Sequence, residues 1–260
     1  MSAPREVVAR HDSLPDPFAA LRGLSGKLRA VLVRSHGDSA LRTETYLAGD
    51  STMFHALPLM PLSAKAGSSW RGYRVGYWPG EQARARAARY ALPAGFIAVT
   101  PDNADLAVSQ RFRLRHFLTH DQQDAWPKVL VLQLPLIDKL ELIADRLAQL
   151  GRSDAVKVMS GFRTPQYNAQ GVGRGGRARD SRHMYGDAAD IYVDADGDGR
   201  MDDLDRDGRV TINDARWLAQ VAEEVGALYP ELVGGIGVYK ANAVHGPFVH
   251  VDLRGTLVRW

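Results

Sequence analysis

The acidic segment between residues 194 and 214 restricts what this chain can fold into more than any other feature, because it holds eight aspartates and few apolar residues. Like charges at these separations repel one another strongly, so the segment needs a cation to become compact. Two overlapping stretches, 194–205 and 203–214, place aspartates at alternate positions, a glycine at position six and an apolar residue at position eight. This is the spacing of an EF-hand-type calcium loop, so we predict a structural insert that binds one or two Ca²⁺ ions.

The two predicted loops offer carboxylate, hydroxyl and backbone carbonyl oxygens. The candidate calcium ligands are Asp194, Asp196, Asp198, Arg200, Asp202, Asp203, Asp205, Asp207, Arg209, Thr211 and Asp214. Position twelve is Asp rather than Glu in both loops, which resembles dockerin modules and the calcium repeats of thrombospondin. Asp205 belongs to both loops, so the number of ions stays open. The alternative is a solvated acidic loop that binds no metal.

Composition limits the classes of site and partner. The chain has no cysteine, which excludes disulfides and thiolate ligands, so a transition-metal site must use His, Asp or Glu. A net charge of +3 with scattered arginines does not indicate a nucleic-acid groove, and we expect no nucleic-acid partner. No apolar run reaches the roughly 18 residues of a membrane span, and the first residues lack the apolar segment of a signal peptide.

The pattern along the chain predicts three parts. Residues 1–26 are polar, with prolines and glycines, and predict a flexible lead-in. Residues 27–94 alternate short apolar runs with turn residues and predict a small β-rich N-terminal domain. Residues 95–260 mix helices with hairpin-like strands, which predicts an α+β domain that contains the acidic insert.

Two helices and several strands of the third part can be placed by periodicity. The spacing over 136–150 predicts a helix with an apolar face and with Asp138, Lys139 and Glu141 on the opposite face. A second amphipathic helix is predicted over 213–226. Short strands are predicted over 156–160, 190–193, 235–239 and 248–253.

Some polar features have an ordinary structural explanation. His36 and His55 stand alone in the sequence, and an isolated histidine is usually a surface or packing residue. The glycine- and arginine-rich stretch 171–179 predicts either a mobile solvated loop or a cationic lip beside an active site.

Three side chains have the chemistry of a metal site. His183 and Asp190 lie seven residues apart with small residues between them, so the chain can turn tightly around an ion. The period of a strand places His250 on one face with Phe248 and Asp252, while the residues between them point into the core. Two histidines and one carboxylate with an open fourth position form a catalytic zinc site. Taken alone, His250 could instead be a core histidine.

Several motifs together resemble the zinc D-alanyl-D-alanine peptidases, the peptidase M15 family, which shares the fold of the hedgehog signalling domain. The resemblance spans about residues 95–260 and keeps the order of the motifs. They are Ser160-Gly161-Phe162-Arg163-Thr164-Pro165, Asn168, the Ser181-x-His183-x-x-Gly186-x-Ala188-x-Asp190 run and Phe248-Val249-His250-Val251-Asp252.

The resemblance implies a role for five residues. His183, Asp190 and His250 match the family's three zinc ligands. Arg163 matches an arginine that holds the polarised carbonyl oxygen or the substrate carboxylate, and a structural salt bridge is the alternative. Ser181 matches a serine that lines the substrate pocket.

The general base departs from the family's pattern. Several members carry a glutamate three residues before the last histidine, where this chain has Pro247. A base must lie within hydrogen-bond reach of the attacking water. Asp252 is our first candidate, with His245 and Asp187 as weaker ones. Asp252 could instead orient His250.

The resulting prediction is a zinc metallopeptidase that hydrolyses D-amino-acid-containing bonds of peptidoglycan stem peptides, as a carboxypeptidase or an endopeptidase. Low-affinity calcium loops work outside the cytosol, which favours the periplasm or cell envelope. The main alternative is a non-catalytic metal-containing module that binds cell wall or protein, and a dockerin-like assembly protein is a third. The sequence leaves the oligomeric state unknown.

Overall fold

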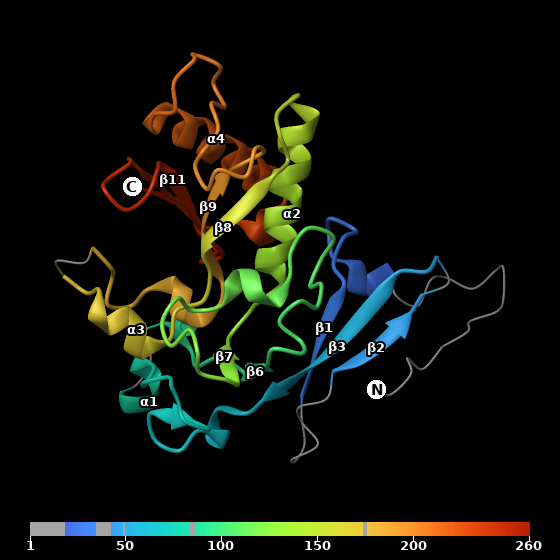
Figure 1. Cartoon of the computed structure of the whole chain (residues 1–260), viewed down its shortest axis with the longest axis vertical. Helices are drawn as coiled ribbons and strands as arrows, with labels where there is room; N and C mark the ends of the chain where they lie inside the picture. Colours follow the sequence, from blue (N-terminus) through green and yellow to red (C-terminus); the bar gives the residue numbers. More distant parts are fainter. Residues whose placement is uncertain (1–18, 35–42, 49, 84–86, 174–175) are drawn as a thin grey trace.

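The computed structural model describes residues 19–34, 43–48, 50–83, 87–173 and 176–260. The described residues form a mixed α/β protein with two five-stranded sheets and a short hairpin. In Figure 1 the sheet that contains β8, β9 and β11 lies in the upper half with helices α2 and α4, and the sheet that contains β1, β2 and β3 lies below it. None of the described helices is long and apolar enough to cross a membrane.

The first sheet has the strand order β1-β3-β6-β7, and β2 also pairs with β3. Its strands are β1 (Ala30–Arg34), β2 (Glu44–Leu47), β3 (Met53–Met60), β6 (Phe96–Val99) and β7 (Lys128–Leu130). It therefore takes strands from both sides of residue 94, where we predict the end of the N-terminal domain. The sheet pairing does not mark this boundary, which stays a prediction. The hairpin β4 (Ser69–Trp70) and β5 (Tyr73–Arg74) and the short helix α1 (Pro79–Gln82) follow β3.

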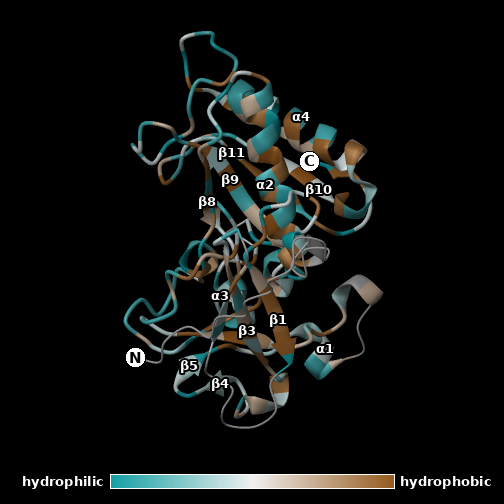
Figure 2. Cartoon of the chain, turned by 90° about the vertical axis from the view of Figure 1, so that its right-hand side faces the viewer, coloured by the Kyte–Doolittle hydropathy of each residue, from teal (hydrophilic) through white to brown (hydrophobic). Residues whose placement is uncertain are grey.

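The second sheet has the strand order β12-β10-β11-β9-β8. Its strands are β8 (Val156–Ser160), β9 (Ala188–Val193), β10 (Gly235–Tyr239), β11 (Phe248–Asp252) and β12 (Val258–Arg259). Helix α4 (Ile212–Leu228) packs on β10 and β11, and helix α2 (Leu134–Gln149) packs on α4. Figure 2 shows hydrophilic and hydrophobic faces on both helices. The hydrophobic periodicity of the sequence predicted these two helices and most of this sheet. It missed strand β12 and helix α3 (Pro165–Gln170).

The polar face of α2 is buried, which corrects the simple amphipathic interpretation. Asp138, Lys139 and Glu141 are each at most 3% exposed. Asp138 accepts hydrogen bonds from the backbone N–H groups of Leu24 and Ser25, at 2.5 and 2.8 Å, and Glu141 forms an ion pair with Arg111. Polar groups can be buried when they find such partners. The described end of the predicted lead-in is thus bonded to α2, while residues 1–18 lie outside the described residues.

A left-handed glycine closes the turn between two of the predicted metal ligands. The 3₁₀ helix Arg182–Tyr185 carries His183 and ends at Gly186, whose φ is 69°. A Cβ atom at Gly186 would overlap the Val131 carbonyl, and the Gly186 carbonyl accepts a hydrogen bond of 2.9 Å from the Gln133 N–H. The turn into β9 is therefore pressed against the end of the first sheet.

We predict that Gly186→Ala destabilises the protein by more than its φ angle alone requires. A positive φ costs a non-glycine residue about 1–2 kcal/mol, and forced overlap adds roughly 1–3 kcal/mol. Gly255→Ala is the matched control, because Gly255 has a φ of 80° but open space around it. Urea unfolding measures both variants. Equal losses of unfolding free energy would contradict the proposed contact with Val131.

Candidate metal centre

Three elements bring the predicted zinc ligands together. Strands β9 and β11 are antiparallel, and His250 lies directly opposite Asp190 in their register. Side chains opposite each other on one face of a sheet lie close enough to bind the same ion. His183 comes from the 3₁₀ helix that precedes β9. All three residues are buried, with exposed fractions of 2%, 5% and 7% for His183, Asp190 and His250.

The three inward-facing donor atoms form a nearly equilateral triangle. His183 Nε2 lies 3.1 Å from His250 Nδ1 and 3.2 Å from Asp190 Oδ1, and His250 Nδ1 lies 3.0 Å from Asp190 Oδ1. Ligands bound to zinc in a tetrahedron, with bonds of about 2.0–2.1 Å, are separated by about 3.3 Å. The donor set and its spacing therefore fit a zinc ion held by three protein ligands.

The outer nitrogen of each histidine is tied to the protein. His183 Nδ1 donates to the Gly161 carbonyl at 2.6 Å, and His250 Nε2 donates to Asp252 Oδ2 at 3.2 Å. These bonds fix the rings so that the lone pairs of His183 Nε2 and His250 Nδ1 face the centre. Metal-binding histidines are typically held in this way.

Electrostatics favour the metal-binding protonation states of His183 and Asp190. Burial lowers the pKa of His183, with Asp190 acting against this shift. Burial alone would lower the pKa of His250 as well, but its hydrogen bonds to Asp190 and Asp252 outweigh burial and raise that pKa. Burial alone would raise the pKa of Asp190, but the two adjoining imidazoles outweigh it and hold that pKa well below its usual range. The centre thus combines a neutral His183 with an ionised Asp190.

Arg163 contacts a predicted ligand directly. It forms an ion pair with Asp190, and its Nε donates to Ser160 Oγ at 2.9 Å. The salt-bridge alternative therefore describes part of its role, because the guanidinium fixes the second oxygen of Asp190. Ser181 lies at the start of the 3₁₀ helix, is 7% exposed, and makes no cap hydrogen bond through its side chain.

The geometry disfavours Asp252 as the general base. Asp252 is fully buried and lies on the outer side of the His250 ring, whereas the metal ligands meet at the inner side. Its oxygens also accept bonds from the Gly235 N–H at 2.7 Å and from the guanidinium of Arg254. Burial raises its pKa, but His250 and Arg254 together lower it far below the usual value. Its arrangement matches the alternative role, which is to orient His250.

The two weaker candidates differ from each other. Asp187 is 1% exposed and is paired with the Arg182 guanidinium, so it is not available to a substrate. His245 is half-buried and lines a cleft, but both its ring nitrogens have partners. These are the Gly246 carbonyl and the Asn242 side chain, each at 2.8 Å.

The sequence reasoning missed an aromatic wall beside His250. The Trp260 ring lies 5.2 Å from the His250 ring, and its Nε1 donates to the Tyr239 hydroxyl at 2.6 Å. A Cβ at Gly237 would come within 2.5 Å of Trp260 Nε1, so only glycine on β10 leaves room for this side chain. The alternating glycines at 235 and 237 were the available signal.

The arginine- and glycine-rich stretch is only partly described, because residues 174–175 lie outside the described residues. Arg177 lies over the Tyr167 ring of α3 at 4.1 Å, and its backbone N–H donates to the Gly171 carbonyl at 2.9 Å. The cationic-lip interpretation stays a prediction. His36 also lies outside the described residues, whereas His55 is buried and bonded to Thr45 at 3.0 Å, as a packing residue would be.

The acidic segment gathers two groups of carboxylates. Asp194, Asp196 and Asp202 form one group, and Asp203, Asp205 and Asp214 form the other, each with oxygens within 4.8 Å of one another. Asp205 belongs to the second group rather than to both. Burial and the neighbouring aspartates raise the pKa of Asp202, which is the expected sign of mutual repulsion.

The remaining predicted calcium ligands make hydrogen bonds within the loops. Asp198 and Asp207 each accept a bond of 2.8 Å, from the Arg200 N–H and the Arg209 N–H respectively. Thr211 caps helix α4 by accepting a bond of 3.0 Å from the Asn213 N–H. The structure therefore brings six of the predicted carboxylates into groups and leaves Asp198 and Asp207 outside them.

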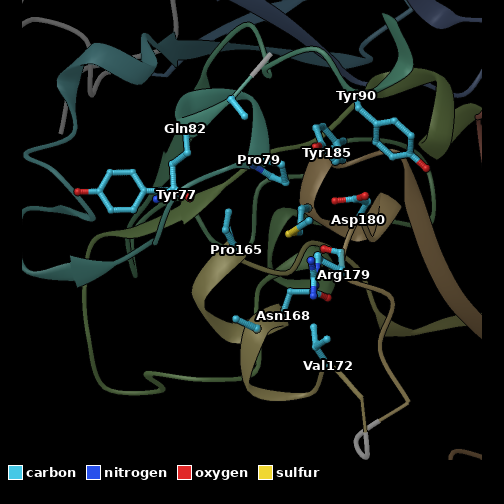
Figure 3. A pocket seen from close by; sticks show the side chains of 13 residues that line it. Tyr77, Pro79, Gln82, Tyr90, Pro165, Asn168, Val172, Arg179, Asp180 and Tyr185 are labelled. Atoms are coloured by element: carbon cyan, nitrogen blue, oxygen red, sulfur yellow. The ribbon is translucent and has the colours of Figure 1, made fainter. Parts of the chain in front are cut away.

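Two cavities are lined by elements that carry or pair with the candidate ligands, but none of the three ligands lines either cavity. A cavity of 330 Å³ is lined by side chains of α3 and of the 3₁₀ helix, and Figure 3 shows Asp180 and Arg179 on one side of it with Tyr77 and Gln82 on the other. The second is a cleft of 840 Å³ along the β8 and β9 side of the sheet, with Met159 and Tyr192 in its lining.

Comparison with known proteins gives one match. The family model for Peptidase M15 matches residues 111–212, a range that includes His183, Asp190, Arg163 and Ser181 and ends before His250. No curated protein and no solved structure matches the chain. The match supports the predicted family resemblance over this segment.

We predict that Asp252→Ala strongly destabilises the fold. Removing this carboxylate leaves Arg254 and His250 Nε2 without their buried acceptor, and breaking a buried pair from one side costs about 3–5 kcal/mol. The matched control is Glu223→Ala, which breaks the exposed pair between Glu223 and Arg259 and should change stability little. Chemical unfolding of both variants checks this. Similar stabilities would contradict the buried role of Asp252.

Proposed function

We propose that the chain is a zinc metallopeptidase acting on bacterial cell-wall peptides. The premise is that residues 111–212 belong to the peptidase M15 family. The observation that carries the proposal is the triangle of His183 Nε2, Asp190 Oδ1 and His250 Nδ1 with sides of 3.0–3.2 Å. Three protein donors leave a fourth position for water or substrate, which is typical of catalytic rather than structural zinc. We also propose that the domain that carries this site has the hedgehog/DD-peptidase fold.

The chain's own residues would hold and orient the reacting groups. When bound, zinc supplies a Lewis acid that polarises a carbonyl and lowers the pKa of water. Asp252 and the Gly161 carbonyl hold the two imidazoles in place, and Arg163 holds Asp190. The remaining N–H groups of the Arg163 guanidinium can donate to a substrate carbonyl oxygen as negative charge develops on it. Ser181, whose side chain does not cap the helix, is proposed to contact the substrate.

The proposed substrates are stem peptides of peptidoglycan with D-amino-acid-containing bonds. The support is the family match together with the resemblance of the motifs to DD-peptidases. Both carboxypeptidase and endopeptidase action fit this proposal. The corresponding location is the periplasm or cell envelope, where the substrate lies.

We further propose that the acidic insert binds calcium. The support is the EF-hand-type spacing and the two carboxylate groups, in which like charges crowd together and favour a cation. The insert connects β9, which carries Asp190, to α4, which packs on β11. Calcium would therefore stiffen the support of two zinc ligands.

One observation favours a second candidate function, a non-catalytic metal-containing module that binds cell wall or protein. Position 247 is proline, and Asp252 and Asp187 are both buried in ion pairs. A module without a general base would keep the metal and lose hydrolysis. The following experiment distinguishes the two functions.

We predict that purified protein carries one zinc ion per chain and releases peptides from peptidoglycan. His183→Ala should lose both the zinc and the product, because two remaining ligands hold zinc weakly. His55→Ala is the control, since His55 is a buried histidine outside the centre. Elemental mass spectrometry and chromatography of the digest measure the two quantities. Zinc without product would favour the binding module, and absence of zinc would contradict the proposal.

We predict that calcium raises the melting temperature of the zinc-loaded, calcium-free protein, whereas an equal concentration of magnesium does so much less. A ligand at about 100 times its Kd stabilises the native state by about 2.7 kcal/mol. Asp196→Asn and Asp205→Asn should each reduce the gain, and Asp102→Asn, outside both groups, should not. Differential scanning calorimetry checks this. An unchanged melting temperature in calcium would refute the calcium proposal.

A further inference from the structure

The segment Phe117–His120 is bonded directly to the loop that supports the metal centre. The Phe162 N–H donates to the Phe117 carbonyl at 2.9 Å, and Thr119 Oγ1 donates to the Phe162 carbonyl at 3.1 Å. A Cβ at Gly161 would lie 2.7 Å from the Phe117 Cα, so the two backbones are as close as a glycine allows. The carbonyl of this same Gly161 accepts the hydrogen bond from His183. The position of His120 is therefore coupled to that of a zinc ligand.

The side chain of His120 is held at the metal-side end of β8. Its ring bonds to the Met159 backbone, which lies at the irregularity in the pairing of β8 with β9. The next residue, Ser160, lies opposite Asp190 in this pairing. His120 is itself exposed, and it makes no other side-chain hydrogen bond to a described residue. One ring nitrogen is thus available to accept a proton.

His120 and His245 face the same cleft from different elements. The 840 Å³ cleft is lined by both histidines, by Met159 of β8 and by Tyr192 of β9. Tyr192 is two residues beyond Asp190 and lies on the same face of the strand. The cleft therefore borders the sheet face that carries Asp190, although none of the three candidate metal ligands lines it. A peptide that reaches from the cleft to these ligands would run beside His120, which lines the cleft.

The charged groups around His120 favour its neutral form. Although His120 reaches solvent, the protein atoms around its ring partly desolvate it and lower its pKa. Arg163 and Arg177 lower this pKa further, and the bond to Met159 and the charge of Asp190 oppose the shift. The other titratable groups that line the cleft are Arg115, His116, Lys128, Tyr192 and His245. No carboxylate is among the described residues that line the cleft, so nothing there stabilises a protonated His120 by direct pairing.

We propose that His120 is the proton-transfer residue of this centre, and this rests on the proposed peptidase function. It would take the place of the general base, which Pro247 cannot supply in this chain. A water molecule forms the new C–O bond to the scissile carbonyl, and its proton moves to the free nitrogen of His120. His120 then gives the proton to the amine nitrogen as the C–N bond breaks. Asp252 and Asp187 are already paired, and His245 would first have to release Asn242.

Kinetics of the zinc-loaded protein on a synthetic stem pentapeptide test the assignment. His120→Gln should lower kcat by about a hundredfold to ten-thousandfold, with KM and zinc content little changed. In the wild type, kcat should fall as the pH drops through the pKa of His120, which lies below the usual value of about 6.5. The pH profile of His120→Gln should lack this acidic limb. Imidazole should restore activity to His120→Ala. His55→Gln is the matched control, because His55 lies in the first sheet.

Parallel measurements on His245→Gln separate the two cleft histidines. Loss of the acidic limb in His245→Gln, with the limb intact in His120→Gln, would overturn the assignment. A kcat within about threefold of wild type in His120→Gln would overturn it as well, because a lost general base costs far more.

A second readout does not depend on turnover. The imidazole ¹⁵N signals of His120 in the zinc-loaded protein should shift when a phosphinate dipeptide analogue is added, and those of His55 should not. A shift of His120 in a protein that hydrolyses no peptide would support its contact with the ligand while refuting the proposed peptidase function. Unchanged His120 signals with bound analogue would refute the contact itself.

Discussion

The antiparallel register between β9 and β11 is the constraint on which the rest of the centre depends. It sets His250 opposite Asp190, and burial of Ala189, Ile191 and Val249 on the other face keeps both candidate ligands pointing away from the apolar core. A slip of one residue in either strand would turn its ligand into the core and its apolar neighbours outward. Apolar packing under α4 therefore sets the geometry of the polar centre.

Buried polar groups then determine how the ligands are oriented. Lys139 of α2 donates to the Asp252 carbonyl at 2.9 Å, and the Asp252 side chain joins Arg254 to His250. Burial lowers the pKa of Lys139 to about 8, with the nearby Asp252 carboxylate opposing the shift. A connected path of polar contacts thus runs from a helix on one face of the sheet to a ligand on the other, and each group on it has a partner.

Local patterns predicted the parts of the fold and site that depend on local spacing. The period of two placed His250 and Asp252 on one strand face, and the His183 to Asp190 spacing gave a turn that closes around one point. The same reasoning could not show which ring nitrogen of His250 faces the centre, so it ranked Asp252 first as a base. The burial of Asp138 and Glu141, the sheet pairing across residue 94 and the position of His120 all depend on contacts distant in sequence, which periodicity does not encode.

The most direct test of the central claim is a crystal structure of the zinc-loaded protein with anomalous diffraction recorded on both sides of the zinc absorption edge. We expect one anomalous peak bounded by His183 Nε2, Asp190 Oδ1 and His250 Nδ1, with bonds of about 2.0–2.2 Å and no further protein ligand. An anomalous peak held by other residues, a fourth protein ligand that closes the site, or no peak between these atoms would contradict the account.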